Sequence, residues 1–226
     1  MEKEIDKPNF SGWREGAKFY APCLALGLGL IAMGWGTYHI YAGIPLFLLG
    51  LVILAFFRDP NRPMTAGSGE YVAPADGKVV GIESLEETPH YEGPCERLSI
   101  FLSLLDVHVN RSPCDGIVTR LDYQPGKFLD ARSPDASEQN EAMTIRMDTP
   151  RGPVTVRQVA GLVARRIVCA RVVGNTLEQG ERIGMIRFGS RTELYLPPGT
   201  EITVQLDDMV RGCADVVARS TEIDAL

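Results

Sequence analysis

The sequence has few of the residues that build metal sites and disulfide frameworks. It contains three histidines, with no His-x-x-x-His pair, and five cysteines, with no Cys-x-x-Cys pair. An odd number of cysteines fits buried thiols in a reducing compartment, and we expect no protein-bound metal. The formal net charge of −6 argues against a general nucleic-acid-binding protein, which would be basic. We therefore expect no nucleic-acid partner.

Several common catalytic motifs are also missing. The chain has no Gly-x-Ser-x-Gly elbow, no phosphate-binding Walker loop and no Gly-x-Gly-x-x-Gly. The commonest hydrolase, nucleoside-triphosphatase and dinucleotide-binding classes are thereby excluded. The 226 residues are 45% hydrophobic and 23% charged, which is ordinary for one moderate globular domain or a domain with an accessory segment.

Charge is absent from residues 19–57. A spanning helix needs about 20 apolar residues, so this stretch is too long for one helix and nearly long enough for two. We predict two short helices, at roughly 20–34 and 44–57, joined by a polar, aromatic turn at 34–43. His39 would then be a turn residue at the membrane interface.

Basic residues flank this apolar segment on both sides, which predicts that both of its ends are cytoplasmic and that it forms a hairpin. These residues are Lys3, Lys7, Arg14 and Lys18 before it, and Arg58 and Arg62 after it. A cleaved signal peptide is not expected. The short arms leave a shallow or re-entrant hairpin open, and a buried pair of core helices is the remaining alternative. The predicted segments are a cytoplasmic terminus (1–18), the membrane hairpin (19–57), a proline-containing linker (58–70) and a body (71–226).

The body has the pattern of a β-rich domain. Short strand-like runs separated by turns follow one another from residue 77 to residue 218, which predicts a mostly β sandwich or barrel with few helices. Segments 73–80 and 174–186 resemble the two hammerhead halves of lipoyl and biotinyl carrier domains, a barrel-sandwich hybrid. A carrier needs a lysine at a hairpin tip, and neither Lys78 nor Lys127 stands in such a motif. The resemblance therefore predicts the fold and not the carrier function.

His108 and Asp76 are candidate catalytic residues. Strand alternation would place Asp106, His108 and Asn110 on one face. That face is either the solvated side of an edge strand or a general acid/base with its orienting partners, and the spacing favours neither. Asp76 stands in Pro74-Ala75-Asp76-Gly77, where a turn former is the default.

Two further features each have an ordinary and a functional interpretation. Arg165 and Arg166 interrupt an apolar run, so one of them should point inward, towards either a structural carboxylate or a substrate phosphate or carboxylate. Gly189-Ser190 follows the strand-like run 182–188. This pair is either a turn between two strands or a self-cleaving bond.

An ordered set of motifs resembles the short class of phosphatidylserine decarboxylase proenzymes. The set covers nearly the whole chain, and its members are Phe56-Phe57-Arg58-Asp59-Pro60, Pro74-Ala75-Asp76-Gly77, residues 103–111, Pro125-Gly126-Lys127-Phe128, Asn140-Glu141, residues 158–167 and Arg187-Phe188-Gly189-Ser190-Arg191.

The resemblance implies a mechanism. Ser190 attacks the carbonyl of Gly189, the chain is cut into 1–189 and 190–226, and residue 190 becomes a covalent pyruvoyl cofactor. The pyruvoyl group forms a Schiff base with phosphatidylserine, which is converted to phosphatidylethanolamine and CO2. Asp76 and His108 match family positions and are the candidate base and orienting carboxylate.

One position departs from the long class of the family, which carries two histidines in the segment corresponding to 106–113. Arg111 stands at the second of these positions. Either His108 serves both cleavage and decarboxylation, or cleavage depends on strain and Asp76. Arg111, Arg165 and Arg166 are candidates for binding the substrate phosphate or carboxylate.

The resemblance also implies partners and a location. We expect a protein of the inner cell membrane, with its catalytic domain on the cytoplasmic side and its two cleavage chains paired as a heterodimer; a higher homo-oligomer is left open. Two alternatives are a membrane-anchored, lipoyl-like adaptor without catalysis, and a pyruvoyl decarboxylase of a soluble amino acid. The hairpin argues against a soluble substrate.

Overall fold

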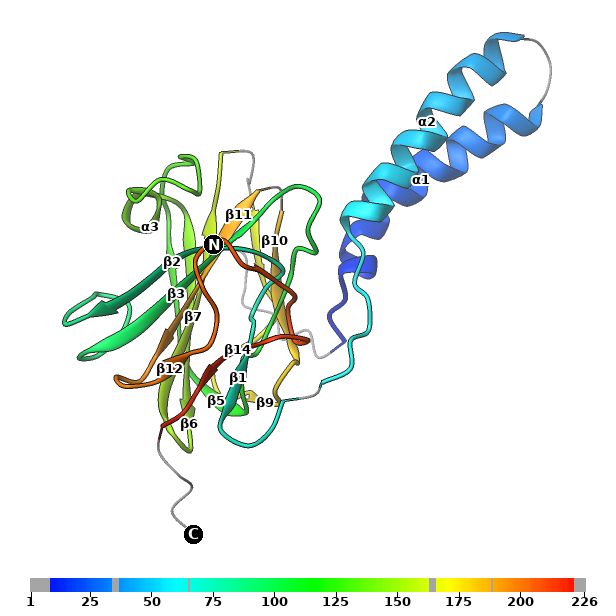
Figure 1. Cartoon of the computed structure of the whole chain (residues 1–226). Helices are drawn as coiled ribbons and strands as arrows, with labels where there is room; N and C mark the ends of the chain where they lie inside the picture. The colour runs from blue at the N-terminus through cyan, green and yellow to red at the C-terminus, as the bar shows by residue number, and fades with distance from the viewer. Residues whose placement is uncertain (1–8, 34–36, 65, 163–165, 188, 222–226) are drawn as a thin grey trace. The chain divides into compact units, whose positions relative to one another are not determined.

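The computed structural model describes residues 9–33, 37–64, 66–162, 166–187 and 189–221. Two compact units are present: a helical unit, Phe10–Pro60, and a larger unit that runs from Asn61 onward. The larger unit is mostly β (Figure 1). The prediction of a mostly β body preceded by a pair of apolar helices is confirmed.

The helical unit contains α1 (Gly12–Met33) and α2 (Thr37–Phe56), of 22 and 20 residues. At 1.5 Å per residue they are about 33 and 30 Å long, and both are long and apolar enough to cross a bilayer. From residue 37 onward the predicted turn is wrong, because α2 begins at Thr37 and includes His39. The predicted short arms are wrong, because both helices are longer than predicted. Tyr side chains mark the depth of a segment in a membrane but do not break a helix. Residues 34–36 lie outside the described residues.

Glycines allow α1 and α2 to pack closely. A Cβ added at Gly27 would lie under 3.0 Å from the backbone of Phe47, and one added at Gly43 would lie equally close to the carbonyl of Gly27. Small residues at such contacts are typical of helix pairs in membranes. At the open end of the helix pair, the carboxylate of Asp59, which follows α2, accepts a hydrogen bond of 3.1 Å from the amide of Gly12, the first residue of α1.

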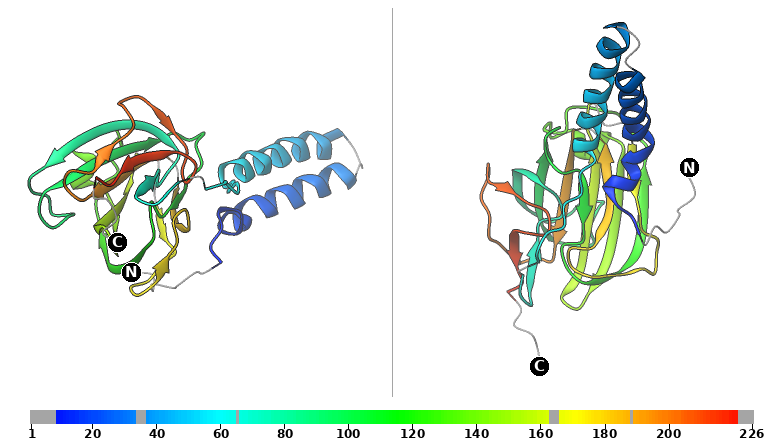
Figure 2. Two further views of the ribbon diagram at one scale, coloured as in Figure 1. Left: turned by 60° about the horizontal axis from the view of Figure 1, so that its bottom comes forward. Right: turned by 90° about the vertical axis from the view of Figure 1, so that its right-hand side faces the viewer.

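The main sheet of the larger unit is antiparallel, has the strand order β13-β2-β3-β11-β7-β6-β5-β9 and curls into a half-barrel (Figure 2). Its strands are β2 (Gly77–Leu85), β3 (Cys95–Leu102), β5 (Gly116–Gln124), β6 (Ala142–Thr149), β7 (Gly152–Ala160), β9 (Thr176–Leu177), β11 (Ser190–Leu196) and β13 (Met209–Val210). Two smaller sheets have the orders β4-β10-β8 and β1-β14-β12. They consist of β1 (Glu70–Val72), β4 (Val109–Arg111), β8 (Arg166–Cys169), β10 (Arg182–Arg187), β12 (Glu201–Ile202) and β14 (Val216–Arg219), and a short helix, α3 (Ala136–Gln139), precedes β6.

One apolar core joins the three sheets. It contains Leu98 and Leu194 of the main sheet, Ile183 of β10 and Val217 of β14, all fully buried. These residues come from strands with alternating inward side chains, as expected for sheets packed face to face. The core fixes the position of β11, whose first residue is Ser190.

The predicted strand through Asp106 and His108 is wrong before residue 109. Ser103–Asp106 form a turn, in which the Asp106 amide donates to the Ser103 carbonyl (3.1 Å) and the Asp106 carboxylate accepts from the Ser103 amide (2.7 Å). A short carboxylate that bonds nearby amides favours a turn over a strand. Only Val109–Arg111 are extended, as β4.

Candidate active site

Ser190 begins β11 in the middle of the main sheet. It pairs with Leu102 of β3 on one side and with Ala160 of β7 on the other, and it is fully buried. Among the residues that the structure describes, its Oγ has no hydrogen-bond partner. Buried hydroxyls are nearly always bonded, so this one calls for an explanation other than packing.

Gly189 lies in the connection between β10 of one sheet and β11 of another. Its φ of 55° lies in the left-handed region, which glycine adopts without steric cost. A Cβ added at Gly161 would lie under 3.0 Å from the carbonyl oxygen of Gly189. Gly161 therefore leaves the space in which this carbonyl packs against the end of β7.

His108 is fully buried, and its Nδ1 lies 2.9 Å from the main-chain carbonyl of Asp106. A carbonyl only accepts hydrogen bonds, so the contact places a proton on Nδ1 and leaves Nε2 as the basic nitrogen of the neutral ring. The carbonyl of His108 accepts a bond of 3.3 Å from the amide of Ile186, in the strand that leads to Gly189. This backbone hydrogen bond connects His108 to β10, the strand that precedes the candidate cleavage bond.

A row of buried polar side chains joins the segments of His108 and Ser190. Asn110 Nδ2 donates to Thr192 Oγ1 over 3.0 Å, and Gln158 Nε2 donates to Asn110 Oδ1 over 2.7 Å. All three residues are fully buried. Because Asn110 follows His108 closely, and Thr192 follows Ser190 closely, the two segments adjoin here. Thr192 and Gln158 were not predicted, since isolated polar residues in a strand usually face solvent.

Asp76 lies at the same end of the main sheet as Ser190, with β3 between their strands. Two strand spacings separate them, or about 10 Å between backbones. The Asp76 carboxylate forms an ion pair of 2.5 Å with Arg62 and accepts a bond of 2.8 Å from the Gly212 amide. In this structure its described partners are therefore Arg62 and Gly212, while the Asp106 carbonyl orients His108.

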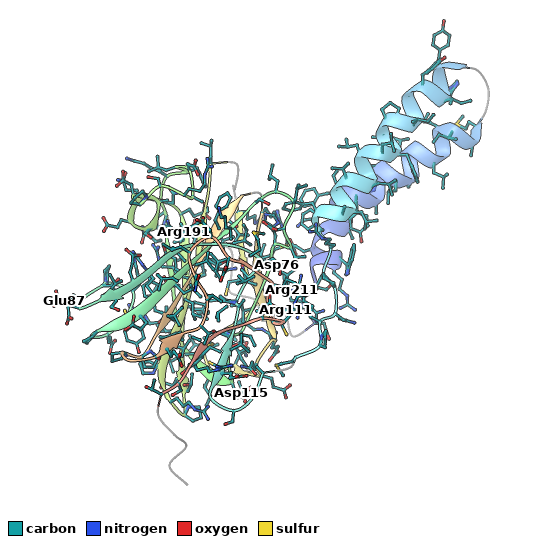
Figure 3. The ribbon with its side chains drawn as sticks, in the orientation of Figure 1. Asp76, Glu87, Arg111, Asp115, Arg191 and Arg211 are labelled. Carbon is teal, nitrogen blue, oxygen red and sulfur yellow. The ribbon has the colours of Figure 1, made fainter. Side chains whose placement is uncertain are left out.

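The candidate substrate-binding arginines differ in their surroundings. Arg111 is buried near Asp76 (Figure 3), and its guanidinium donates to the carbonyl of Gly180 over 3.1 Å. Arg166 is exposed and begins β8, opposite Arg187 of β10. Arg165 lies outside the described residues.

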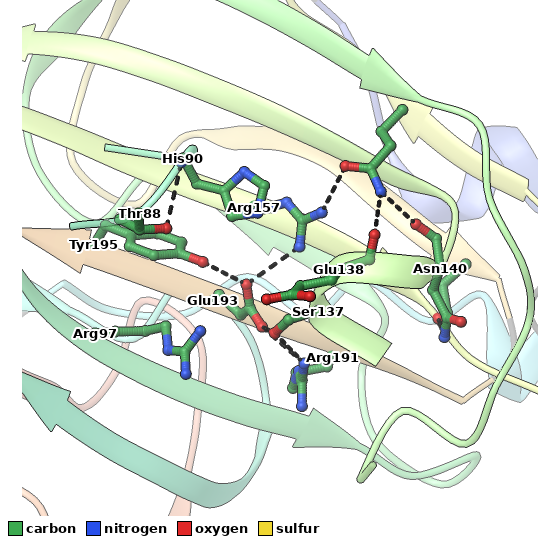
Figure 4. Close-up of polar contacts among 12 residues, drawn as sticks. Thr88, His90, Arg97, Ser137, Glu138, Asn140, Arg157, Arg191, Glu193 and Tyr195 are labelled. Atoms are coloured by element: carbon green, nitrogen blue, oxygen red, sulfur yellow. Dashed lines mark hydrogen bonds and ion pairs between the residues drawn. The ribbon is translucent and has the colours of Figure 1, made fainter. Parts of the chain in front are cut away.

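A buried charged cluster occupies the other face of β11 (Figure 4). Glu193 is fully buried and pairs with Arg191 at 2.9 Å and with Arg157 at 3.4 Å, and it accepts a bond of 2.7 Å from the Tyr195 hydroxyl. Burial alone would raise the pKa of Glu193, but the two guanidinium groups hold it below its ordinary value. The carboxylate therefore stays ionised inside the protein.

The polar segment that leads into β6 is a packed part of the surroundings of Ser190. Its Ser137, on α3, is buried and bonds both Glu193 and Arg191 through its hydroxyl. Asn140 is fully buried, and its Nδ2 donates to the carbonyl of Ala160 over 2.7 Å. The first contact holds β11 itself, and the second holds the end of β7, which pairs with Ser190.

Comparison with known proteins identifies the family. A family model described as phosphatidylserine decarboxylase matches residues 49–218. The chain is similar to proteins named phosphatidylserine decarboxylase proenzyme. The one from Magnetococcus marinus is 43% identical over 197 residues, which cover 87% of this chain and 89% of that protein. The one from Symbiobacterium thermophilum is 42% identical over 207 residues, which cover 91% and 94%. The one from Gluconacetobacter diazotrophicus is 48% identical over 170 residues, which cover 74% and 76%.

The motifs around Asp76, His108 and Ser190 lie within the matched residues. The Ser190 hydroxyl, which is buried and has no partner within the described part of the chain, and the adjoining segment of His108 are consistent with an active site in this part of the sheet. With a family match over most of its length, this chain is an enzyme and belongs to the phosphatidylserine decarboxylase family.

Proposed function

We propose that this chain is a self-processing, pyruvoyl-dependent enzyme that converts phosphatidylserine to phosphatidylethanolamine and CO2. The observation that carries the self-processing is the Ser190 hydroxyl, which is buried without a described partner and directly follows a glycine in the left-handed region. Holding a nucleophile next to its target replaces an encounter between two molecules and lowers the barrier. The substrate and the reaction are those of the family.

Cleavage in this proposal needs only the chain and one water molecule. Oγ of Ser190 bonds to the carbonyl carbon of Gly189, the amide C–N bond breaks, and the proton of the hydroxyl passes through a base to the freed amine. Loss of the Cα proton of residue 190 then breaks its Cβ–O bond and releases Gly189 as a carboxylate. Water adds to the resulting dehydroalanine and ammonia leaves, so the chain 190–226 begins with a pyruvoyl group.

His108 is the proposed base, acting through Nε2. Its Nδ1 contact with the Asp106 carbonyl sets the tautomer that this role requires. Arg111 stands where the long class has a second histidine, and a guanidinium does not give up its proton at ordinary pH. We therefore assign both cleavage and decarboxylation to His108. Asp76 is the second candidate, and its bonds to Arg62 and Gly212 would have to rearrange for it to reach the imidazole.

Residue 190 remains at the start of β11 after cleavage, between β3 and β7. A pyruvoyl group at residue 190 would supply Schiff-base chemistry towards the substrate amine and an electron sink for decarboxylation. His108 provides the proton that replaces the lost carboxylate. Arg111 and Arg166 are candidates for binding the phosphate or carboxylate of the substrate, and Arg165 belongs to the same proposal.

We place the enzyme in the inner cell membrane with its β unit on the cytoplasmic side. α1 and α2 supply the apolar length, and the basic residues on both sides of the hairpin supply the orientation. In this proposal the chains 1–189 and 190–226 remain together as one enzyme.

Mass spectrometry of the chain ends tests the proposal. We expect two chains under denaturing conditions, 1–189 and 190–226, with the shorter one blocked at its N-terminus. Ser190→Ala should remain a single chain and be inactive, while His108→Ala should lose at least tenfold in decarboxylation. An intact single chain in a preparation that decarboxylates phosphatidylserine would overturn self-processing, and so would an active Ser190→Ala variant.

A further inference from the structure

The end of the main sheet at which Ser190 lies carries exposed apolar side chains on three loops. We call Leu104, Leu105, Phe128 and Leu162 the leucine rim. Their side chains are 51%, 83%, 37% and 69% exposed. Exposed apolar groups gathered around one end of a sheet indicate an interaction surface more strongly than isolated ones do.

Strand register places the rim around the active site. Ser190 pairs with Leu102, the last residue of β3, and with Ala160, the last residue of β7. Leu104 and Leu105 follow the first of these strands, and Leu162 follows the second. Phe128 follows β5, whose last residue pairs with the first residue of β6 at this same end. From β3 to β5 is four strand spacings, or about 19 Å along the sheet.

We propose that the leucine rim is the surface through which the β unit contacts the lipid bilayer, with the Leu104–Leu105 turn entering the interface. This inference rests on the proposed function, because it assigns the rim to a lipid substrate. The acyl chains of phosphatidylserine stay in the hydrocarbon while its headgroup reaches residue 190. The end of the sheet that holds this residue must then face the bilayer.

The turn at the rim is suited to a membrane because three of its backbone amides are satisfied internally. The Ser103 amide donates to the Asp106 carboxylate (2.7 Å), the Asp106 amide donates to the Ser103 carbonyl (3.1 Å), and the Leu105 amide donates to the Ser103 hydroxyl (3.4 Å). An amide that enters lipid without a partner costs several kcal/mol. The two leucines thus extend beyond a turn that needs no water for these amides.

Fluorescence of the full-length protein in phosphatidylserine-containing vesicles tests the contact. We expect L105W to be quenched by brominated acyl chains at least threefold more than I117W. Ile117 is a matched control because it is 49% exposed and lies near the opposite end of β5. The two natural tryptophans give the same background in both proteins. Equal quenching of the two variants would overturn the proposal.

Activity provides the second test, with L104S/L105S compared with I117S. On vesicles we expect the rim variant to show a KM for phosphatidylserine raised at least tenfold. On a short-chain, water-dispersed phosphatidylserine we expect unchanged kcat and KM, because that substrate needs no bilayer contact. A loss on both substrates would assign the leucines to the site itself and overturn the proposal, and so would unchanged kinetics on vesicles.

The two tests separate the rim from the function on which it rests. Quenching requires neither cleavage nor turnover, so it reports on the contact even in Ser190→Ala. If the unsubstituted protein fails to cleave or to decarboxylate, the proposed function is wrong. If it does both and L105W is not quenched, only the proposed contact of the leucine rim with the bilayer is wrong.

Discussion

Gly161 is the residue whose size bears most directly on the proposed cleavage bond. A Cβ at this position would meet the Gly189 carbonyl oxygen at under 3.0 Å, so Gly161→Ala must displace that carbonyl or the end of β7. We expect self-cleavage at least tenfold slower, because small displacements of reacting groups are costly in rate. A time course of the intact chain on denaturing gels measures it.

Gly67→Ala is the matched control for this substitution. A Cβ there would be 3.7 Å from its nearest atom, an ordinary contact with the Glu70 carboxylate. We expect cleavage at the unsubstituted rate. Normal cleavage of Gly161→Ala would mean that the Gly189 carbonyl does not need its present position.

His90 is expected to make stability depend on pH. Burial lowers its pKa to about 4, with help from the charges of Arg157, Arg146 and Arg97 and against the influence of Glu193. The unfolded histidine binds its proton near pH 6.5, so between about pH 6.5 and 4 the unfolded state holds more protons, and the folded state loses stability as pH falls. The slope is at most about 1.4 kcal/mol per pH unit, and solvent screening reduces it.

His90→Gln removes this titration and should flatten the fall of Tm between pH 6.5 and 4. Thermal unfolding of the detergent-solubilised protein at several pH values measures the effect. Identical pH profiles for the variant and the unsubstituted chain would show that the imidazole is not held neutral by its surroundings.

Among single residues, the sequence singles out as candidates those that a motif marks, and their catalytic roles stay a prediction. Ser190, Gly189 and His108 stand in such motifs, and the structure places them in one region. Glu193 was not predicted, because a charged residue that alternates with apolar ones in a strand usually faces solvent. Its burial depends on Ser137, more than fifty positions away, which covers that face.

Among the elements, β11 is unusual because all seven of its residues are buried. Glu193→Gln keeps the shape of the side chain and removes the charge that Arg191 and Arg157 share. Since breaking a buried pair leaves an uncompensated charge, we expect the free energy of unfolding to fall by about 3 kcal/mol. Urea denaturation of the detergent-solubilised protein measures the loss.

Glu201→Gln, on the exposed side of β12, is the comparison for this prediction and should change the free energy of unfolding by less than about 0.5 kcal/mol. If the two variants unfold at the same urea concentration, the Glu193 cluster does not stabilise β11.

The longer strands could be predicted because the alternation of their side chains extends over several two-residue repeats. β2, β3, β5, β6 and β7 have eight or nine residues each, and they lie within the predicted succession of strands from residue 77 to residue 218. β1, β4, β9 and β13 have two or three residues, too few for any period to be visible. The start of α2 was missed for a different reason. Tyrosine side chains favour the membrane interface, but this preference does not determine whether the backbone is helical.

For the whole molecule, the two helices predict a transmembrane hairpin. Tyr38 is 87% exposed at the start of α2, and Gly67 lies in the β unit. Spheroplasts treated with a membrane-impermeant thiol reagent should label Tyr38→Cys from outside, whereas Gly67→Cys should be labelled only after lysis. The parent protein supplies the background from its own cysteines. Labelling of Tyr38→Cys only after lysis would indicate a re-entrant hairpin.

The place of β11 in the strand order has a consequence for the order of folding and proposed cleavage. Its neighbours β3 and β7 both precede Gly189 in the chain, and β11 itself follows it. A polypeptide that stopped at Gly189 would carry two unpaired strand edges in the middle of its main sheet, which is a form prone to aggregation. The proposed cleavage therefore requires that folding come first, and a gene divided at this codon would encode two halves of which neither contains a complete sheet. Under this proposal, cleavage would happen once in each molecule and would not be reversed.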